Sequence, residues 1–422
     1  MKQTITFIFF ILSIISFAQP CNGGRYASNI FTTVDVTSDI QYGQNLDLAG
    51  SNVDLFLDFY EPNGDTETAR PLIIWVHGGS FIGGSKTDGD MVALATDFAE
   101  KGFACASINY RLGLNFPPDS SSAIRALTRA VQDLKATVRF FYKDRATTNN
   151  YRIDTTKIFL GGTSAGALTA LHYAYLDKPC EIEHYMDAGT LTSLGGIEGD
   201  SGNAGYSTDV IGILSGAGAL ASYAFLEAGD IPVCSVHGDA DDVVPYIRDY
   251  ASVGPLNIIY MDGSRMIDEQ ASAVGVASNL YTFYGGGHVP YAGNAANMNI
   301  TINFYRDFVI DLMGCTDTPL QPENTPSGTA NLYLPPFCDL NTQEFVFEDA
   351  FLIYPNPSDG VFTIETDEAG IIDIIDLTGK KIFSRNIDEK IKVDLGDQTR
   401  GLYILRHTNS QNNISIHKLI IE

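Results

Sequence analysis

The sequence predicts an α/β fold with a mostly parallel sheet covered by helices on both faces, followed by a small all-β domain. The first observation is the alternation of strand-like and helix-like segments over residues 50–315. The second is the change to short alternating runs from about residue 347. The third is the length of 422 residues, which suggests two domains. A hydrophobic content of 45% and a charged content of 18% indicate a globular protein with a real core.

Five segments alternate over the first half of the α/β region. Residues 53–62 alternate apolar and polar side chains, as a half-buried strand does. Residues 70–79 form a continuous apolar run that ends in glycines and predicts a strand covered on both faces. Residues 91–102 have helical spacing with a terminal glycine, and residues 103–112 predict another buried strand. Residues 122–145 repeat apolar side chains every three or four positions, which predicts a long amphipathic helix.

The second half continues the alternation up to residue 314. Strands are expected at 157–162, 209–218, 231–238 and 280–288, and helices at 165–176 and 297–314. Residues 187–206 are rich in Gly, Ser and Asp and show no periodicity, so they predict a long loop. Such a loop either covers a site or is a mobile surface excursion.

The chain is expected to end in a linker and a sandwich. Residues 317–346 begin with a Pro- and Thr-rich stretch, which is typical of a linker. Residues 347–422 contain short alternating runs separated by turn residues, which predict a small β-sandwich.

The N-terminus predicts a secretory signal peptide over residues 1–18. Lys2 precedes an almost entirely apolar run over residues 5–15, and Ser16-Phe17-Ala18 fits the small-x-small cleavage rule. The run is too short to span a membrane, and no later segment is long and apolar enough. The signal peptide predicts an exported protein. The alternative interpretation of residues 1–18 is a buried first strand.

Six cysteines make disulfides possible after export. They allow 15 connectivities, which the sequence cannot choose between. Cys105 and Cys234 lie in apolar strand-like runs, where a buried free thiol is expected. Cys315 and Cys338 flank a loop-rich stretch, and we expect them to pair with each other. The spacing of the cysteines suggests no zinc site.

Net charge excludes one class of partner. With 26 basic and 51 acidic residues, the formal charge is −25, which repels phosphate backbones. Nucleic acid is therefore not expected to bind.

Ser164 is the candidate nucleophile. It is the central residue of Gly162-Thr163-Ser164-Ala165-Gly166, which follows an apolar strand and precedes a helical segment. In this context the Gly-x-Ser-x-Gly pattern predicts a sharp turn that exposes the serine hydroxyl. The alternative is a purely structural Gly-rich turn. Acyl transfer also requires a base, a carboxylate and donors for the oxyanion.

Backbone N–H groups are expected to hold the oxyanion. His77-Gly78-Gly79 ends a predicted strand, and glycines there leave their N–H groups free to approach a substrate oxygen. The N–H of Ala165, directly after the serine, would complete the set. His77 is expected to brace this loop rather than to transfer protons.

The base and the acid follow later strands. His288 comes after three glycines at the end of the last predicted strand, downstream of the other candidates. Asp239, Asp241 and Asp242 compete for the role of the acid, although adjacent acidic residues also form solvated turns. The neighbouring His237 is expected to be structural.

Residues 50–315 resemble the α/β-hydrolase fold and, within it, the secreted bacterial carboxylesterases. The resemblance is carried by "RPLIIWVHGGSFIGGS", "INYRLG", "FLGGTSAG", "VHGDADDVVPY" and "GGGHVPY". The resemblance implies that the acid is the fifth residue of His-Gly-x-x-Asp, which is Asp241. The chain differs from many members of the family in having His-Gly-Gly-Ser at residues 77–80, where they have a third glycine in place of the serine. The implied order Ser164, Asp241, His288 is that of the α/β-hydrolases.

The C-terminal block resembles the type A sorting domain of the type IX secretion system. The matching positions are Tyr354-Pro355-Asn356-Pro357, Gly360, Phe362, Gly379, Lys380, Gly401 and Tyr403. The resemblance implies secretion or attachment to the cell surface through that machinery. An accessory carbohydrate-binding sandwich is the alternative.

Together these patterns predict a secreted serine carboxylic-ester hydrolase that needs no cofactor or metal. Its substrate would be a small-molecule or polymer-linked ester. The alternatives are a feruloyl or acetyl-xylan esterase, a serine peptidase, and a surface binding protein on an inactivated hydrolase scaffold.

Overall fold

The computed structural model describes residues 21, 24–332, 338, 352–366, 369–376, 380–409 and 414–421. The predicted signal peptide, residues 1–18, lies outside the described residues. Contacts divide the chain into two compact units, Met1–Cys338 and Asp339–Glu422.

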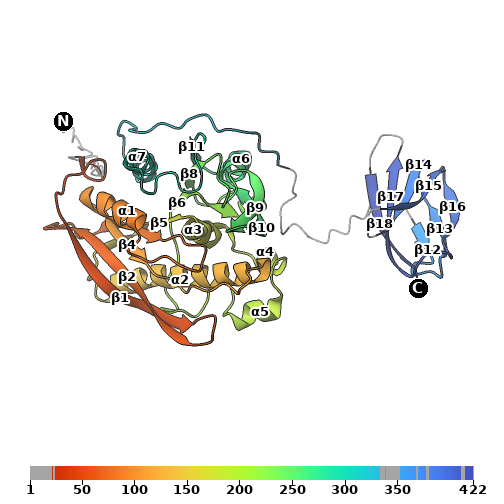
Figure 1. The fold of residues 1–422 in the computed structure, drawn as a ribbon, viewed down its shortest axis with the longest axis horizontal. Helices are drawn as coiled ribbons and strands as arrows, with labels where there is room; N and C mark the ends of the chain where they lie inside the picture. The colour runs from red at the N-terminus through yellow and green to blue at the C-terminus, as the bar shows by residue number, and fades with distance from the viewer. Residues whose placement is uncertain are drawn as a thin grey trace, which may run out of the picture. The chain divides into compact units, whose positions relative to one another are not determined.

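An eight-stranded sheet forms the centre of the first unit (Figure 1), with strand order β1-β2-β4-β3-β5-β6-β8-β11. From β4 to β11 all neighbouring strands are parallel, whereas β2 pairs antiparallel with β1 and β4. This arrangement confirms the predicted fold class. The strands are β1 (Val34–Leu46), β2 (Asn52–Pro62), β3 (Arg70–Val76), β4 (Ala104–Ile108), β5 (Ile153–Thr163), β6 (Gly212–Gly216), β8 (Val233–Gly238) and β11 (Ser278–Phe283).

Helices cover both faces of the sheet, as the continuous apolar character of the central strands requires. Along β3, Leu72 and Ile74 belong to a core shared with α2 (Ser120–Thr147), α3 (Ala165–Tyr175) and α6 (Ser264–Val274). Ile73 and Trp75 belong to a second core, shared with α1 (Gly89–Glu100) and α7 (Ala295–Leu312). Alternate residues of one strand therefore supply two hydrophobic layers.

Several smaller elements were not expected from the sequence. β9 (Arg248–Val253) and β10 (Leu256–Gly263) form an antiparallel hairpin, which pairs with the two-residue strand β7 (Ala219–Leu220). The strand β1 and the helix α6 were also not predicted. The remaining elements of this unit are α4 (Pro179–Glu183), α5 (Ala188–Ser193) and the 3₁₀ helix η2 (Tyr223–Phe225).

The loop expected over residues 187–206 contains α5 and is bound to α2. Gln132 on α2 donates to the carbonyl oxygens of Leu194 and Gly196 at 2.8 and 2.6 Å. Ser201 donates from Oγ to the buried Asp133 at 2.5 Å. These contacts hold the segment against the long helix.

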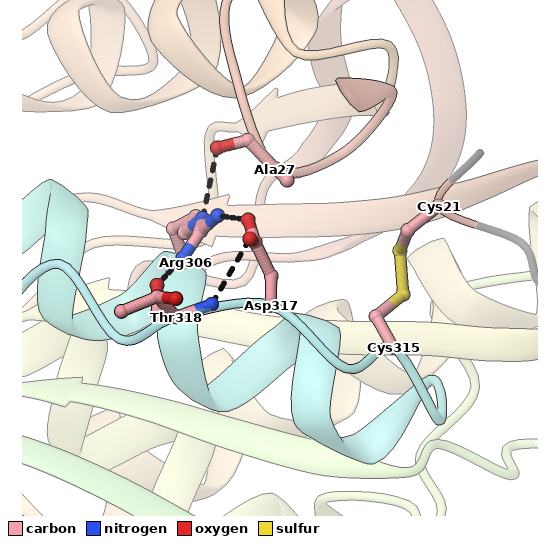
Figure 2. Close-up of a disulfide and its surroundings, with 6 residues drawn as sticks. All are labelled: Cys21, Ala27, Arg306, Cys315, Asp317 and Thr318. Atoms are coloured by element: carbon pink, nitrogen blue, oxygen red, sulfur yellow. Dashed lines mark hydrogen bonds and ion pairs between the residues drawn. A yellow bond between two sulfur atoms is a disulfide. The ribbon is translucent and has the colours of Figure 1, made fainter. Parts of the chain in front are cut away.

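The disulfides differ from the predicted pairing of Cys315 with Cys338. Cys21 bonds to Cys315, and Cys180 bonds to Cys338 (Figure 2 shows the first). The prediction was wrong because the segment between Cys315 and Cys338 does not close on itself, and each of its ends is joined to a distant part of the unit. Cys105 and Cys234 are buried free thiols, as expected.

Residues 316–332, which we call the strap, group with the first unit although a linker was expected there. The Asn324 side chain accepts from the Thr282 N–H and donates to the Thr282 carbonyl, both at 2.8 Å, on the edge strand β11. Arg306 on α7 donates to the Ala27 carbonyl at 2.8 Å and forms an ion pair with Asp317 (Figure 2). The strap therefore lies along the edge of the sheet.

The second unit is a sandwich of two antiparallel sheets, as predicted. One sheet has the order β12-β13-β16 and the other β15-β14-β17-β18. Phe362, Ile364, Ile372, Ile374 and Leu405 are buried in a common core. The strands are β12 (Leu352–Tyr354), β13 (Val361–Glu365), β14 (Gly370–Ile375), β15 (Lys381–Ile387), β16 (Lys390–Asp394), β17 (Gly401–Asn409) and β18 (Ile414–Ile421).

Candidate active site

Ser164 lies between the end of β5 at Thr163 and the start of α3 at Ala165. Its backbone has φ 54° and ψ −120°, a conformation that is costly for a residue other than glycine. The flanking glycines make this turn possible. A Cβ on Gly162 would overlap the backbone of Gly166, and a Cβ on Gly166 would overlap the carbonyl oxygen of Val76. The predicted sharp strand-to-helix turn is therefore present, with the serine at its apex.

Two hydrogen bonds connect the three predicted side chains. His288 Nε2 lies 2.9 Å from Ser164 Oγ, and His288 Nδ1 lies 2.7 Å from Asp241 Oδ2. Ser164 follows β5, Asp241 follows β8 and His288 follows β11. The carboxyl ends of parallel strands share one edge of a sheet, which brings together residues that lie 124 and 47 positions apart.

Asp241 is fixed by four hydrogen bonds and has no exposed side-chain surface. Its Oδ1 accepts from the N–H groups of Val243 and Val244 at 2.8 and 3.0 Å. Its Oδ2 accepts from His288 and from His237 Nε2, the latter at 3.2 Å. Burial alone would raise the pKa of Asp241, but the hydrogen bonds from the two histidines outweigh it and hold that pKa well below its usual range. The carboxyl group is therefore ionised at neutral pH.

The ionised carboxylate determines how the ring of His288 is protonated. A carboxylate can only accept, so Nδ1 must carry the proton that it donates to Asp241. In the neutral ring Nε2 is then an acceptor, and it faces the hydroxyl of Ser164. The arrangement can therefore remove a proton from the serine.

The other two candidate acids lie in different surroundings. Asp239 Oδ1 accepts from the N–H of Gly285 at 2.5 Å, which ties two loops together. Asp242 is exposed to solvent. Within the described part of the chain, Asp241 is the candidate acid that is hydrogen-bonded to His288.

Two of the predicted oxyanion donors, Gly78 and Ala165, lie beside the serine. Gly79 has φ +103°, and a Cβ on it would overlap the carbonyl of Gly83, so the loop requires glycine there. Gly78 lies against Ser164, and a Cβ on Gly78 would lie 3.3 Å from the serine Cβ. Over the described residues, no backbone acceptor takes the N–H of Gly78, Gly79 or Ala165. These groups are available to a substrate oxygen.

Two other histidines have structural partners. His77 Nδ1 lies 2.7 Å from the Gly78 carbonyl, and the His77 ring stacks on Tyr110 at 4.4 Å, which agrees with the predicted bracing role. Burial lowers the pKa of His172 to about 4. His172 Nδ1 donates to the Leu168 carbonyl at 2.8 Å, and Nε2 accepts from the Ala221 N–H at 3.1 Å.

A small apolar cavity of about 60 Å³ opens beside Ser164. The β9–β10 hairpin supplies a large part of its wall, and residues 187–206 supply none of it. Sequence reasoning missed this hairpin and considered only the 187–206 loop as a cover. The signal that could have found it is the Gly254-Pro255 turn between two runs rich in apolar residues.

The described residues offer neither a metal centre nor a membrane span. No group of three His, Cys, Asp or Glu side chains among them could hold a metal ion. Within the same part of the chain, none of the helices has the length and apolarity needed to cross a membrane.

Known families match part of the first unit and most of the second. Residues 57–194 match the family model BD-FAE, and residues 352–422 match the secretion system C-terminal sorting domain. The chain therefore carries a BD-FAE α/β-hydrolase domain of the esterase type, followed by a sorting domain that implies secretion or a cell-surface location.

Individual proteins that are similar to the chain share less than 30% sequence identity with it. Mouse (Mus musculus) carboxylesterase 1D is 27% identical over 110 residues, which are 25% of this chain and 18% of the mouse protein. The chain thus matches less than a fifth of that relative. Esterase 2 of Thermogutta terrifontis, phosphoramylated by tabun, superposes with a TM-score of 0.49 at 17% identity, covering 67% of this chain and 96% of that one. Its apo form gives a TM-score of 0.48 at 18% identity, covering 68% and 98%.

Proposed function

We propose that the chain is a secreted serine ester hydrolase in which Ser164, His288 and Asp241 act as the catalytic triad. The observation that carries the proposal is the pair of hydrogen bonds from Ser164 Oγ to His288 Nε2 and from His288 Nδ1 to Asp241 Oδ2, at 2.9 and 2.7 Å. The strained backbone of Ser164 at the turn supports the same assignment.

The reaction begins when Ser164 Oγ attacks the ester carbonyl carbon and passes its proton to His288 Nε2. The carbonyl oxygen becomes an oxyanion that accepts hydrogen bonds from the N–H groups of Gly78, Gly79 and Ala165. His288 then returns the proton to the leaving alcohol as the carbon–oxygen bond breaks, and an acyl-Ser164 ester remains. Water repeats the sequence, with His288 as the base, and releases the acid.

Asp241 keeps His288 in the reactive tautomer and stabilises the imidazolium that forms. Its ionised state at neutral pH follows from the lowered pKa of its carboxyl group. His237 and the two backbone N–H groups hold the carboxylate in place.

The test is the variant Ser164→Ala assayed with p-nitrophenyl acetate. We expect turnover to fall by several orders of magnitude while the circular dichroism spectrum stays unchanged. Retention of most of the activity would reject the proposal. A peptide nitroanilide assayed in parallel separates the esterase from the peptidase alternative, because an esterase should leave the amide intact.

A further inference from the structure

The loop that carries His288 has a sequence that does not fix its own conformation. Three glycines, residues 285–287, precede the histidine, and Val289 directly after it has φ +49°, which is rare for a β-branched residue. The position of the imidazole therefore depends on contacts that the loop makes with other segments. The hydrogen bond of 2.9 Å between His288 Nε2 and Ser164 Oγ requires such contacts.

On its amino-terminal side this loop is bound to the loop of the proposed acid. The N–H of Gly285 donates to Asp239 Oδ1 at 2.5 Å. The carbonyl oxygen of Gly286 accepts from the N–H of Ala240 at 2.9 Å. These two bonds hold the proposed base close to the proposed acid, but neither of them reaches the turn that carries the nucleophile.

On its carboxyl-terminal side the same loop is bound to the nucleophile turn. Tyr291, three residues after His288, has its hydroxyl oxygen 2.8 Å from Thr163 Oγ1. Thr163 is the last residue of β5 and directly precedes Ser164. One hydrogen bond between two hydroxyl groups thus joins the residue before the nucleophile to the loop of the base.

Burial makes this bond depend on the correct position of both segments. Tyr291 is 1% exposed and Thr163 is 4% exposed. Burial also raises the pKa of Tyr291 well above its usual value, so the phenol keeps its proton. A buried hydroxyl without a hydrogen-bond partner is costly, so separating the two segments would leave two such groups.

The neighbouring strand β6 leaves room for the tyrosine hydroxyl. A Cβ on Gly216 would lie 1.9 Å from Tyr291 Oη, so glycine is required there for this hydroxyl to reach Thr163. Gly216 pairs with Thr163 in the sheet, and its carbonyl oxygen accepts from the N–H of Ser164 at 2.8 Å. The tyrosine therefore packs against the two strands that hold the nucleophile turn.

From this geometry we infer that Tyr291 and Thr163 are positioning residues, whose hydrogen bond keeps His288 within reach of Ser164. Neither residue lines the cavity beside Ser164, so they do not bind the substrate there. Their effect is on the alignment of base and nucleophile, which changes the rate of the chemical step and not the affinity for the ester. The inference rests on the function proposed above.

The experiment measures kcat and KM of Tyr291→Phe and Thr163→Val with p-nitrophenyl acetate. Each substitution removes one hydroxyl and largely keeps the shape of the side chain. We expect kcat to fall by roughly 10- to 100-fold in each variant, since a misplacement of about 1 Å costs about 100-fold, while KM changes little. Thr163→Ser keeps the hydroxyl and should retain a kcat close to that of the wild type.

The double variant tests whether the two hydroxyls act through one bond. Tyr291→Phe combined with Thr163→Val should be no slower than the slower single variant, because the second substitution removes a bond that is already lost. Losses that multiply in the double variant would overturn the inference. A kcat within about twofold of the wild type in either single variant would also overturn it.

Tyr305→Phe is the matched control, because it removes another buried hydroxyl from the same core. Tyr305 lies on α7 and is 1% exposed, and its hydroxyl has no hydrogen-bond partner among the described residues. This variant should keep the wild-type kcat, and an equal loss in it would overturn the inference. Urea titration establishes that all of these variants fold.

Ser164→Ala distinguishes the two proposals. If Ser164→Ala is inactive while Tyr291→Phe has the wild-type kcat, only the positioning role is rejected. If Ser164→Ala keeps its turnover, the serine mechanism itself is rejected, and the positioning role is rejected with it.

Discussion

Replacing Asp241 by Asn tests the proposed proton path without changing the size of the side chain. Oδ1 of Asp241 accepts from the N–H groups of Val243 and Val244, so the amide oxygen of Asn is held at that position. The amide NH₂ must then take the place of Oδ2, which faces His288 Nδ1. The amide NH₂ and the Nδ1–H of His288 then face each other, and both are hydrogen-bond donors.

The imidazole can avoid two facing donors by moving its proton from Nδ1 to Nε2. In that tautomer Nε2–H points at Ser164 Oγ, 2.9 Å away, and cannot accept the serine proton. A wrong tautomer of this kind lowers kcat by about 10⁴-fold in a serine hydrolase with the same relay. We expect a loss of that order for Asp241→Asn, equivalent to about 5 kcal/mol of transition-state stabilisation. KM should change little, because Asp241 does not line the cavity.

The assay is steady-state hydrolysis of p-nitrophenyl acetate, with Asp242→Asn as the matched control. Asp242 is the adjacent acid and is exposed, so its variant should keep wild-type kcat. Circular dichroism and urea titration establish that both variants fold. A folded Asp241→Asn variant that keeps more than about a tenth of wild-type kcat would contradict the proposed role of Asp241, as would an equal loss in Asp242→Asn.

Three further predictions concern stability. The pKa of His172 is about 6.5 in the unfolded chain, and burial lowers it to about 4 in the folded protein. The neutral buried ring therefore makes its full contribution to the unfolding free energy above pH 6.5, and this contribution is lost as the pH falls toward 4. Between pH 7 and pH 5 the wild type should lose about 2 kcal/mol more unfolding free energy than His172→Gln in urea titrations, and equal losses would contradict this. Gly166→Ala should destabilise by about 1–3 kcal/mol or more, because the new methyl overlaps the Val76 carbonyl, and an unchanged urea midpoint would contradict the overlap. Replacing Cys180 and Cys338 together by Ser should cost about 2–5 kcal/mol under non-reducing conditions, and the same midpoint as the wild type would argue against that disulfide.

Local patterns were sufficient for the central strands, for the helices α1, α2, α3 and α7 that cover them, and for the turn at Ser164. β3 is an apolar run because it is buried on both faces of the sheet. The positions around Ser164 are glycines because a Cβ there would overlap the neighbouring backbone. The resemblance to carboxylesterases was needed to choose Asp241, since its two acidic neighbours carry the same chemistry. Asp241 differs from these neighbours in its hydrogen bond to His288, which lies 47 positions away in the sequence.

Features that depend on tertiary contact could not be predicted. Cys21 and Cys315 are 294 residues apart, and nothing in the local sequence around either one indicates the other. β9 and β10 lack regular alternation, because several of their residues are partly exposed and one position is irregular, so the Gly254-Pro255 turn is the one local signal of the hairpin. The strap has the composition of a linker, yet the side chain of Asn324 substitutes for backbone pairing on β11.

Mass spectrometry of the enzyme mixed with p-nitrophenyl acetate and quenched with acid tests directly whether Ser164 is the nucleophile. We expect one added acetyl group, located by peptide mapping on Ser164 and absent from Ser164→Ala. We also expect Asp241→Asn to acquire this group far more slowly than the wild type, because His288 no longer accepts the serine proton. Ester turnover by Ser164→Ala at the wild-type rate, or an acetyl group on another residue of an active enzyme, would contradict the assignment of Ser164 as the nucleophile.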